Sequence, residues 1–171
     1  DSSTSRGLGD VYKRQKLCMF LMEVNMASEN ENILISMLLK RDIISINENK
    51  TVFDAIKIIS QNKIGALPVI NNQMKLSGII SERDIIHKLS ENSEMDFSNI
   101  KIKSIMTNKV ITCNKNTQSD VLMTIMTNNK IRHIPIVEKN SLIGIVSIGD
   151  VVKRLLEKIN LENAELKSWV Y

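Results

Sequence analysis

Apolar residues along the chain form short runs that recur twice in the same order. Two of these runs, 67–71 and 76–80, are separated by a polar turn, and the runs 133–138 and 142–147 repeat the arrangement. Apolar runs of this length, bounded by turn residues, are typical of strands. The pattern therefore predicts two hairpins of similar design, one in each half of the chain.

Each predicted hairpin is preceded by a short β-rich run and then by apolar residues at helical spacing. The β-rich runs are 43–46 and 110–113. A hydroxyl residue marks the start of the helix that follows: Thr51 in the first half, and Thr117 or Ser119 in the second. After each hairpin a second helix is expected to begin at Asp84 or Asp150. Each half is thus a βαββα unit.

The two halves are copies of one unit. Pro68 and Pro135, the only prolines, lie 67 residues apart, whereas Asp84 and Asp150 lie 66 residues apart. A one-residue difference in the hairpin turn explains the mismatch. Because a unit of about 60 residues has a marginal core, we expect the copies to pack sheet to sheet with pseudo-two-fold symmetry. The predicted class is α/β (α+β), built from tandem repeats.

Composition shifts suggest how the chain is divided. The expected parts are a leader (1–31), a first repeat (32–92), a polar linker (93–104), a second repeat (105–160) and a helical tail (161–171). Residues 1–15 are rich in Ser and Gly, lack apolar periodicity and resemble a non-native adapter sequence. The tail carries a possible exposed apolar stripe, which consists of Leu161, Leu166, Trp169 and Val170.

Composition excludes several classes of protein. Hydrophobic residues make up 43% of the chain and charged residues 25%, with a net charge of +4 and no block of like charges, so nucleic-acid binding is not indicated. No apolar run reaches the roughly 18 residues of a membrane span. Cys18 and Cys113 have neither metal-ligand nor disulfide spacing, which favours reduced thiols and a cytoplasmic protein.

The chemistry of the chain centres on a doubled turn, Gly-x-x-Ser-x-x-Asp, in GIISERD and GIVSIGD. Ser81 and Ser147 stand where a strand gives way to a helix, where a hydroxyl and unpaired N–H groups can bind phosphate. The aspartates, Asp84 and Asp150, can accept hydrogen bonds from ribose hydroxyls. One such turn could be a helix cap alone, but two in matching positions favour a pair of ligand sites.

The repeat resembles the CBS domain, and the pair resembles a Bateman module of the small stand-alone bacterial kind. The segments that carry the resemblance are GIISERDIIHKL, IMTNKVITC and KIRHIPIVEKNSLIGIVSIGDVVK, and it covers roughly residues 32–171. The resemblance implies two clefts between the packed sheets, dimerisation of modules into a disc, and an adenosyl ligand such as AMP, ATP or NAD(H).

The resemblance also implies the ligand-binding residues. They are Ser45, Ile64, Gly65, Ala66, Pro68, Ser81, Arg83, Asp84, Thr112, Ile131, Arg132, His133, Pro135, Ser147 and Asp150. The aspartates would hold ribose hydroxyls, the serines ribose or phosphate, and the segments 64–68 and 131–135, together with Ser45 and Thr112, would frame the base. Arg83, Arg132 and His133 would neutralise phosphates. Gly149 stands where the first copy has Arg83, so the two clefts are expected to be unequal.

Several of these residues also have simpler structural interpretations. Arg132 and His133 are adjacent, so in a strand they would face opposite sides and at most one would point into a given cleft. Arg83 could form a surface ion pair with a neighbouring carboxylate. His87 is expected to be a solvated helix residue, and Cys113 a buried strand thiol.

The function expected from these features is that of a non-catalytic sensor. Nucleotide binding would alter the packing of a homodimer and so regulate an effector protein, with no metal and no catalytic cofactor. A purely structural dimerisation module with empty clefts is the alternative. Catalysis is disfavoured, although Ser81, Ser147, His87 and His133 supply triad ingredients, because no Gly-x-Ser-x-Gly elbow, metal motif or Walker loop is present. DNA binding is a weaker option, since no basic groove is evident.

Overall fold

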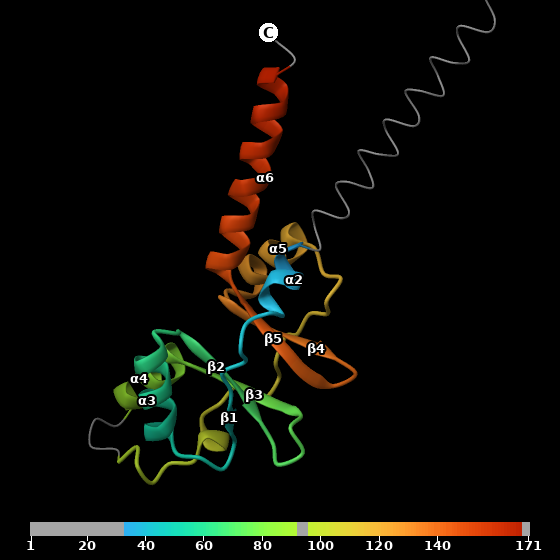
Figure 1. Ribbon diagram of the computed structural model, residues 1–171. Coiled ribbons are helices and arrows are strands. Elements are labelled where there is room, and N and C mark those ends of the chain that lie inside the picture. Colours follow the sequence, from blue (N-terminus) through green and yellow to red (C-terminus); the bar gives the residue numbers. More distant parts are fainter. Residues whose placement is uncertain (1–32, 92–95, 169–171) are drawn as a thin grey trace, which may run out of the picture. The chain divides into compact units, whose positions relative to one another are not determined.

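The computed structural model describes residues 33–91 and 96–168 of the chain (Figure 1). The first repeat consists of β1 (Ile46–Asn47), α3 (Val52–Asn62), β2 (Ala66–Ile70), β3 (Leu76–Ser81) and α4 (Glu82–Glu91). The second repeat consists of α5 (Ser119–Asn129), β4 (His133–Glu138), β5 (Ser141–Ser147) and α6 (Ile148–Ser168). A short helix α2 (Ile33–Leu38) precedes β1, and a 3-10 turn η1 (Ile102–Ser104) lies between α4 and α5.

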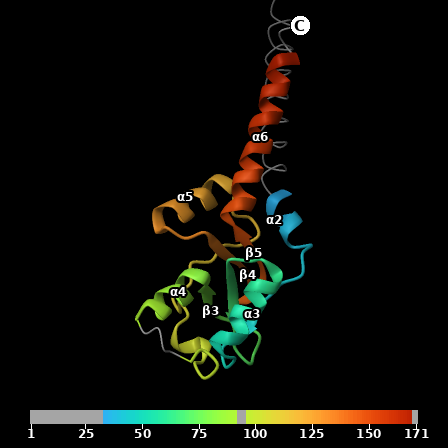
Figure 2. The ribbon, with the colours of Figure 1, turned by 90° about the vertical axis from the view of Figure 1, so that its left-hand side faces the viewer.

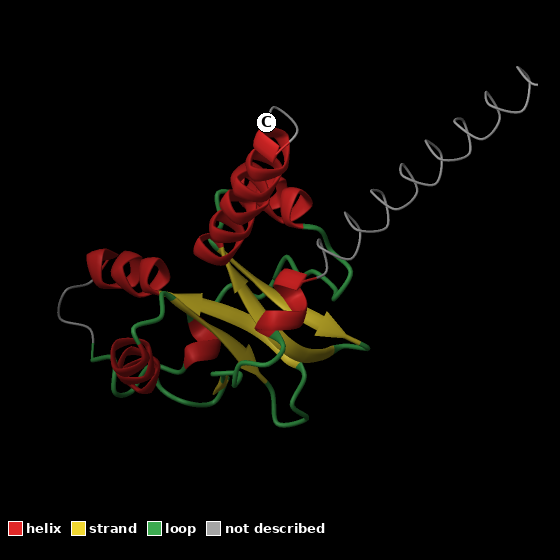
Figure 3. Cartoon of the chain, turned by 45° about the horizontal axis from the view of Figure 1, so that its top comes forward, coloured by secondary structure: helices red, strands yellow, loops and turns green. Residues whose placement is uncertain are grey.

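Both predicted hairpins are confirmed. β2 and β3 pair antiparallel with Pro68 opposite Ile79, and β4 and β5 pair antiparallel with Pro135 opposite Ile145. β1 adds a parallel strand to the first hairpin, which makes a three-stranded sheet beside a two-stranded one. Figure 3 shows the strands at the centre, with the helices outside them. The mixed α/β class of tandem repeats is therefore correct.

The β-rich runs before the helices form less strand than expected. Only Ile46 of the run 43–46 lies in a strand, and the run 110–113 contains none, because its single pairing is a parallel bridge from Cys113 to Ile136. The Cys113 N–H donates to the Pro135 carbonyl at 3.0 Å. The rest of the run does not pair with β4, and Val110 and Ile111 line a cleft.

Two segments pack differently from their expected place in the chain. Helix α2, which lies inside the expected first repeat (32–92), buries Leu34, Ile35 and Leu38 in the core of the second repeat. Figures 1 and 2 both show α2 on the side of the second repeat. Within the expected polar linker, Ile102 is fully buried in the core of the first repeat, and Phe97 packs against that core. Phe97 and Ile102 of the expected linker therefore pack with the first repeat.

The second helix of each repeat begins two residues earlier than the sequence predicts. α4 begins at Glu82 and α6 at Ile148, because the serine before each helix accepts a hydrogen bond from the aspartate N–H in the first turn and so takes the N-cap position. α6 continues to Ser168, so the expected helical tail is present up to that residue, with Leu161 exposed. The side chain of Leu166, as well as Trp169, Val170, Cys18 and the leader 1–31, lies outside the described structure. No helix in the described ranges is both long and apolar enough to cross a membrane.

The start of α3 is held by a capping box. The Asp54 N–H donates to Thr51 Oγ1 at 3.2 Å, and the Thr51 N–H donates to Asp54 Oδ2 at 3.1 Å. These hydrogen bonds, with the one from the Thr51 hydroxyl, lower the pKa of Asp54 below its ordinary value. By contrast α5 begins after Gln118, whose side chain makes no capping hydrogen bond.

Removing the cap of α3 should therefore destabilise the protein. Thr51→Ala should lower the free energy of unfolding by about 1 kcal/mol, measured by urea denaturation followed by circular dichroism. Gln118→Ala is the matched control at the corresponding helix start and should change it by less than about 0.5 kcal/mol. Equal losses in the two variants would contradict the assigned role of Thr51.

Candidate functional site

The doubled turn folds in the same way in both repeats. In the first, Asp84 Oδ2 accepts hydrogen bonds from the Ser81 N–H at 2.8 Å and from the Ser81 hydroxyl at 2.6 Å. In the second, Asp150 Oδ2 accepts hydrogen bonds from the Ser147 N–H at 3.0 Å and from the Ser147 hydroxyl. The pair thus caps the helix, as the simpler interpretation proposed, and holds the carboxylate rigidly at the end of the strand.

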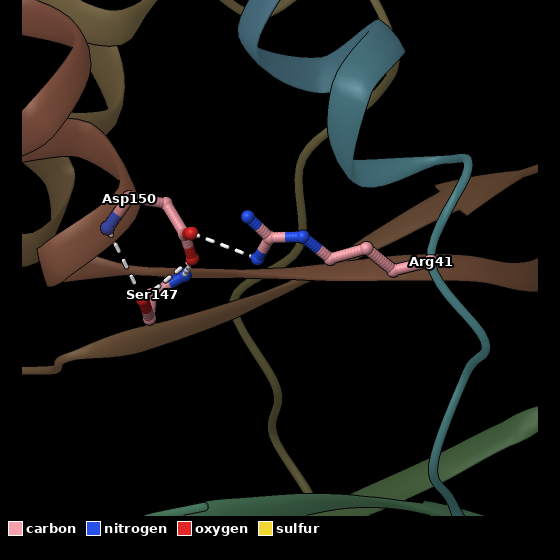
Figure 4. Close-up of polar contacts among 3 residues, drawn as sticks. All are labelled: Arg41, Ser147 and Asp150. Carbon is pink, nitrogen blue, oxygen red and sulfur yellow. Dashed lines mark hydrogen bonds and ion pairs between the residues drawn. The ribbon is translucent and has the colours of Figure 1, made fainter.

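The second carboxylate oxygen distinguishes the two aspartates. Asp150 Oδ1 receives the Arg41 guanidinium at 2.9 Å, an ion pair between residues 109 apart in sequence (Figure 4). Burial alone would raise the pKa of Asp150, but the hydrogen bonds from Ser147 and the pairing with Arg41 outweigh it, so this pKa lies below the ordinary value. Among the described residues, no side chain pairs with Asp84 Oδ1.

Asp84 lies in a cleft of about 270 Å³ that both repeats line. From the first repeat come Gly65, Ala66, Ile79, Ser81, Glu82, Arg83 and Asp84. From the second come residues 109–111 and 130–133, preceded by Thr107. The walls combine apolar side chains with the Ser–Asp pair and several cations, which is the usual make-up of a small-molecule site.

Asp150 lies in a second cleft, of about 360 Å³, with the equivalent architecture. Its lining from the second repeat is His133, Gly144, Ile145, Ser147 and Asp150. Residues 63–66 of the first repeat and the segment 41–44, with Leu38 before it, complete the cleft. Each cleft thus combines the Ser–Asp pair of one repeat with the segment before β2 or β4 of the other.

The expectation that at most one of Arg132 and His133 points into a given cleft was wrong. Both line the first cleft, because β4 begins at His133 and the alternation of a strand does not apply to Arg132. His133 lines the second cleft too, and its imidazole lies beside Gly65. Burial lowers the pKa of His133 and outweighs the opposing charges of Asp150 and Glu82, so the side chain is neutral at pH 7.

Most of the residues implied by the resemblance line a cleft. Ser81, Arg83, Asp84, Ile131 and Arg132 line the first, Ile64, Ser147 and Asp150 the second, and Gly65, Ala66 and His133 line both. Four residues line neither cleft: Ser45, Pro68, Thr112 and Pro135. Both prolines are buried inside their strands. Ser45 and Thr112 lie one residue beyond the segments that reach the clefts, 41–44 and 109–111.

Sequence reasoning missed several lining residues, of which Arg41, Lys63, Lys109 and Lys130 are cations. The internal repeat relates two of them, because Lys63 precedes Ile64 as Lys130 precedes Ile131. Nothing local marks Arg41, whose partner belongs to the other repeat.

Gly78 shapes the rim of the first cleft. A Cβ at this position would lie 2.5 Å from the Met106 sulfur and 3.1 Å from the Thr107 carbonyl oxygen. The absence of a side chain lets the backbone of Thr107 pair with Ile79 through two hydrogen bonds of 2.9 and 3.0 Å. This pairing holds Thr107 in the wall of the first cleft, which residues 109–111 also line.

The remaining reactive side chains of the described ranges are not arranged as a Ser–His–Asp triad. The two serines of the turn donate their hydroxyl protons to the aspartates, and neither histidine hydrogen-bonds to them. His87 is exposed near Glu91 on α4. Cys113 is buried, as expected, and burial raises its pKa to about 11, so the thiol stays protonated. No three His, Cys, Asp or Glu side chains of the described residues come together as a metal ion would require.

Two curated proteins contain sequences similar to this chain. The mitochondrial CBS domain-containing protein CBSX3 of Arabidopsis thaliana is 40% identical over 124 residues, which cover 70% of this chain and 60% of the relative. The inosine-5'-monophosphate dehydrogenase of Methanocaldococcus jannaschii is 28% identical over 86% of this chain. The chain spans only 28% of that enzyme's length.

Solved structures match the fold closely. A CBS-domain containing protein of Agrobacterium tumefaciens has a TM-score of 0.66 at 32% identity and covers 72% of this chain and 91% of its own. The CBS domain pair of protein MJ0100, in complex with 5'-methylthioadenosine and S-adenosyl-L-methionine, has a TM-score of 0.65 at 28% identity, with 72% and 96% covered. A CBS domain protein of Pyrobaculum aerophilum complexed with AMP has a TM-score of 0.61 at 26% identity, with 67% and 87% covered.

The family model of the CBS domain matches two segments, 35–91 and 102–157. Each segment includes one hairpin and one Ser–Asp turn of the structure. This chain therefore belongs to the CBS domain family and carries a tandem pair of such domains.

Proposed function

We propose that this chain is a non-catalytic regulatory module that binds an adenine nucleotide (AMP, ATP or NAD(H)) in its two clefts. The observation that carries the proposal is the rigid Ser–Asp pair at the mouth of each cleft, with Asp84 Oδ1 open to a ligand. A fixed carboxylate oxygen is suited to accept hydrogen bonds from ribose hydroxyls. The adenosyl ligands bound by two of the structural relatives support the same class of ligand.

The first cleft offers a place for each part of a nucleotide. Asp84 would hold the ribose, and the N-terminus of α4 together with Ser81 would face the first phosphate. Ala66, Ile79 and Ile131 provide an apolar wall against which adenine would lie. Arg83 and Arg132 line the same cleft from different repeats and would neutralise the phosphate tail. In this arrangement both repeats must be in place for the nucleotide to bind.

The four expected site residues that line neither cleft have an indirect role in this proposal. They are Ser45, Thr112, Pro68 and Pro135. The prolines and the bridge at Cys113 fix the strands that carry the cleft walls. Ser45 and Thr112 follow the segments that line the clefts, so they would contact the base only if the ligand shifts these segments.

Regulation would pass through a homodimer. Ile86 and Leu89 on α4, and Val152 and Leu156 on α6, are exposed apolar side chains on the helices that follow the Ser–Asp turns. A second copy of the chain that covers these faces would contact α4 and α6, the helices whose N-termini lie at the proposed ligand sites. Ligand binding would then alter this dimer contact. Its effector is an unidentified partner protein, and the reduced thiols expected from the sequence make the cytoplasm its proposed compartment.

Isothermal titration of the full chain with AMP, ATP and NADH tests the proposal. At least one of them should bind with a dissociation constant in the micromolar range, and Asp84→Ala should remove the stronger phase of binding. Absence of binding by all three compounds would refute the proposal.

A purely structural dimerisation module is the second candidate, and the exposed apolar faces of α4 and α6 favour it independently of the clefts. A thermal-shift measurement separates the two. A ligand of the native state raises the melting temperature by mass action, so a dimer whose melting temperature does not change in millimolar nucleotide would be purely structural.

A further inference from the structure

The charges around the first cleft are strongly unbalanced. Its lining holds four permanent cations and two carboxylates: Arg83, Lys109, Lys130 and Arg132 against Glu82 and Asp84. Three of these cations come from the second repeat and one from the first. None of the four forms an ion pair with any other side chain in the described part of the chain. Their charge is therefore available to a ligand, and the walls of a cleft concentrate the resulting field.

The second cleft is neutral. Its lining holds two cations, Arg41 and Lys63, and two carboxylates, Asp42 and Asp150. Arg41 is already bonded to Asp150, and this aspartate side chain is only 17% exposed. The repeat provides Asn108 at the position that corresponds to Arg41, so the first cleft has no counterpart of this ion pair.

The second residue of the helix after each Ser–Asp turn adds to the difference in charge between the clefts. In the first repeat this residue is Arg83, which lines the first cleft, whereas in the second repeat it is Gly149, which lines neither cleft. A Cβ on Gly149 would meet only the Ser147 hydroxyl, at an ordinary distance of 3.6 Å. The structure therefore accommodates a Cβ at this position without a close contact.

We infer that the two clefts select ligands of different charge: the first takes a nucleoside di- or triphosphate, and the second a nucleoside with at most one phosphate. The inference rests on the proposed nucleotide-binding function and assigns a ligand class to each cleft. Each further phosphate brings negative charge, which four unpaired cations stabilise and a neutral cleft does not. In the second cleft the ligand must also displace Arg41 from Asp150, and one phosphate suffices to pair with the displaced guanidinium.

The test measures ATP and adenosine binding to each cleft separately. Asp150→Ala leaves the first cleft intact, and Asp84→Ala leaves the second; both are titrated as full-length chains at about 0.15 M salt, after circular dichroism shows that they are folded. In Asp150→Ala, ATP should bind at least about tenfold more tightly than adenosine. In Asp84→Ala, ATP should bind no more tightly than adenosine.

A charge insertion tests the same inference without touching either aspartate. Gly149→Arg should strengthen ATP binding in the second cleft about tenfold and leave adenosine binding there unchanged. Gly149→Gln, which adds similar bulk without charge, is the control and should leave the ATP affinity unchanged.

The possible failures can be told apart. An equal ATP-to-adenosine preference in Asp84→Ala and Asp150→Ala, or no gain of ATP affinity in Gly149→Arg, would overturn the assignment of ligand classes but not nucleotide binding itself. If the folded, unaltered chain binds neither compound, the proposed function fails and this inference fails with it.

Discussion

A chain that carries both Asp84→Ala and Asp150→Ala should bind AMP at least about 100-fold more weakly than the unaltered chain. Each aspartate is the fixed carboxylate of one cleft, held through Oδ2 by the serine before it. A hydrogen bond to a charged group contributes about 1.5–3 kcal/mol, and the proposed ribose grip involves two hydroxyls. Each single substitution should abolish one of two binding phases in isothermal titration.

The control must separate lost contacts from lost helix capping, because both aspartates also cap a helix. Asp54→Ala breaks the same kind of capping box at the start of α3, and Asp54 lines neither cleft. It should destabilise the chain without changing the affinity for AMP. If Asp54→Ala weakens binding as much as Asp84→Ala does, the aspartates act through stability and the ribose assignment is wrong.

Ile35→Ala should lower the free energy of unfolding by about 2–4 kcal/mol, a large share of the stability of an ordinary domain. Ile35 is only 1% exposed and packs in the core of the second repeat. The truncation would leave a cavity among side chains such as Ile134 and Ile136. Hydrogen exchange should show the loss of protection in β4 and β5, about 100 residues further along the chain.

Met37→Ala is the matched control for Ile35→Ala. Met37 lies on the same short helix and is 54% exposed, so its truncation should cost less than about 0.5 kcal/mol. Equal costs for the two substitutions, or protection lost in β2 and β3 alone, would contradict the packing of α2 on the second repeat.

The hairpins and helices could be predicted because their signals are local and occur twice. Pro68 and Pro135 mark equivalent strands, and the polar turns after them mark both hairpins. By contrast the placement of α2 could not be predicted, since apolar spacing shows which face of a helix is buried but not which core receives it. The run 110–113 was expected to be a strand because its composition suits one, whereas Val110 and Ile111 line a cleft instead.

For the candidate site, the repeat identified the Ser–Asp pairs, and the structure shows both at the clefts. It could not reveal that Arg41 pairs with Asp150, because the two residues meet only after the repeats pack. The same limit applies to Arg132, which faces the first cleft beside His133 because the strand begins one residue later. The inequality of the clefts was expected from Arg83 and Gly149, but the larger contribution of Arg41, Lys109 and Lys130 depends on tertiary structure.

The most direct test of the ribose grip is a crystal structure of the full chain grown with AMP. We expect the ribose hydroxyls to lie within about 3.2 Å of a carboxylate oxygen of Asp84 or Asp150. We also expect Arg41 to have left Asp150 wherever the second cleft is filled. AMP bound with its ribose away from both aspartates would contradict the proposed ribose grip.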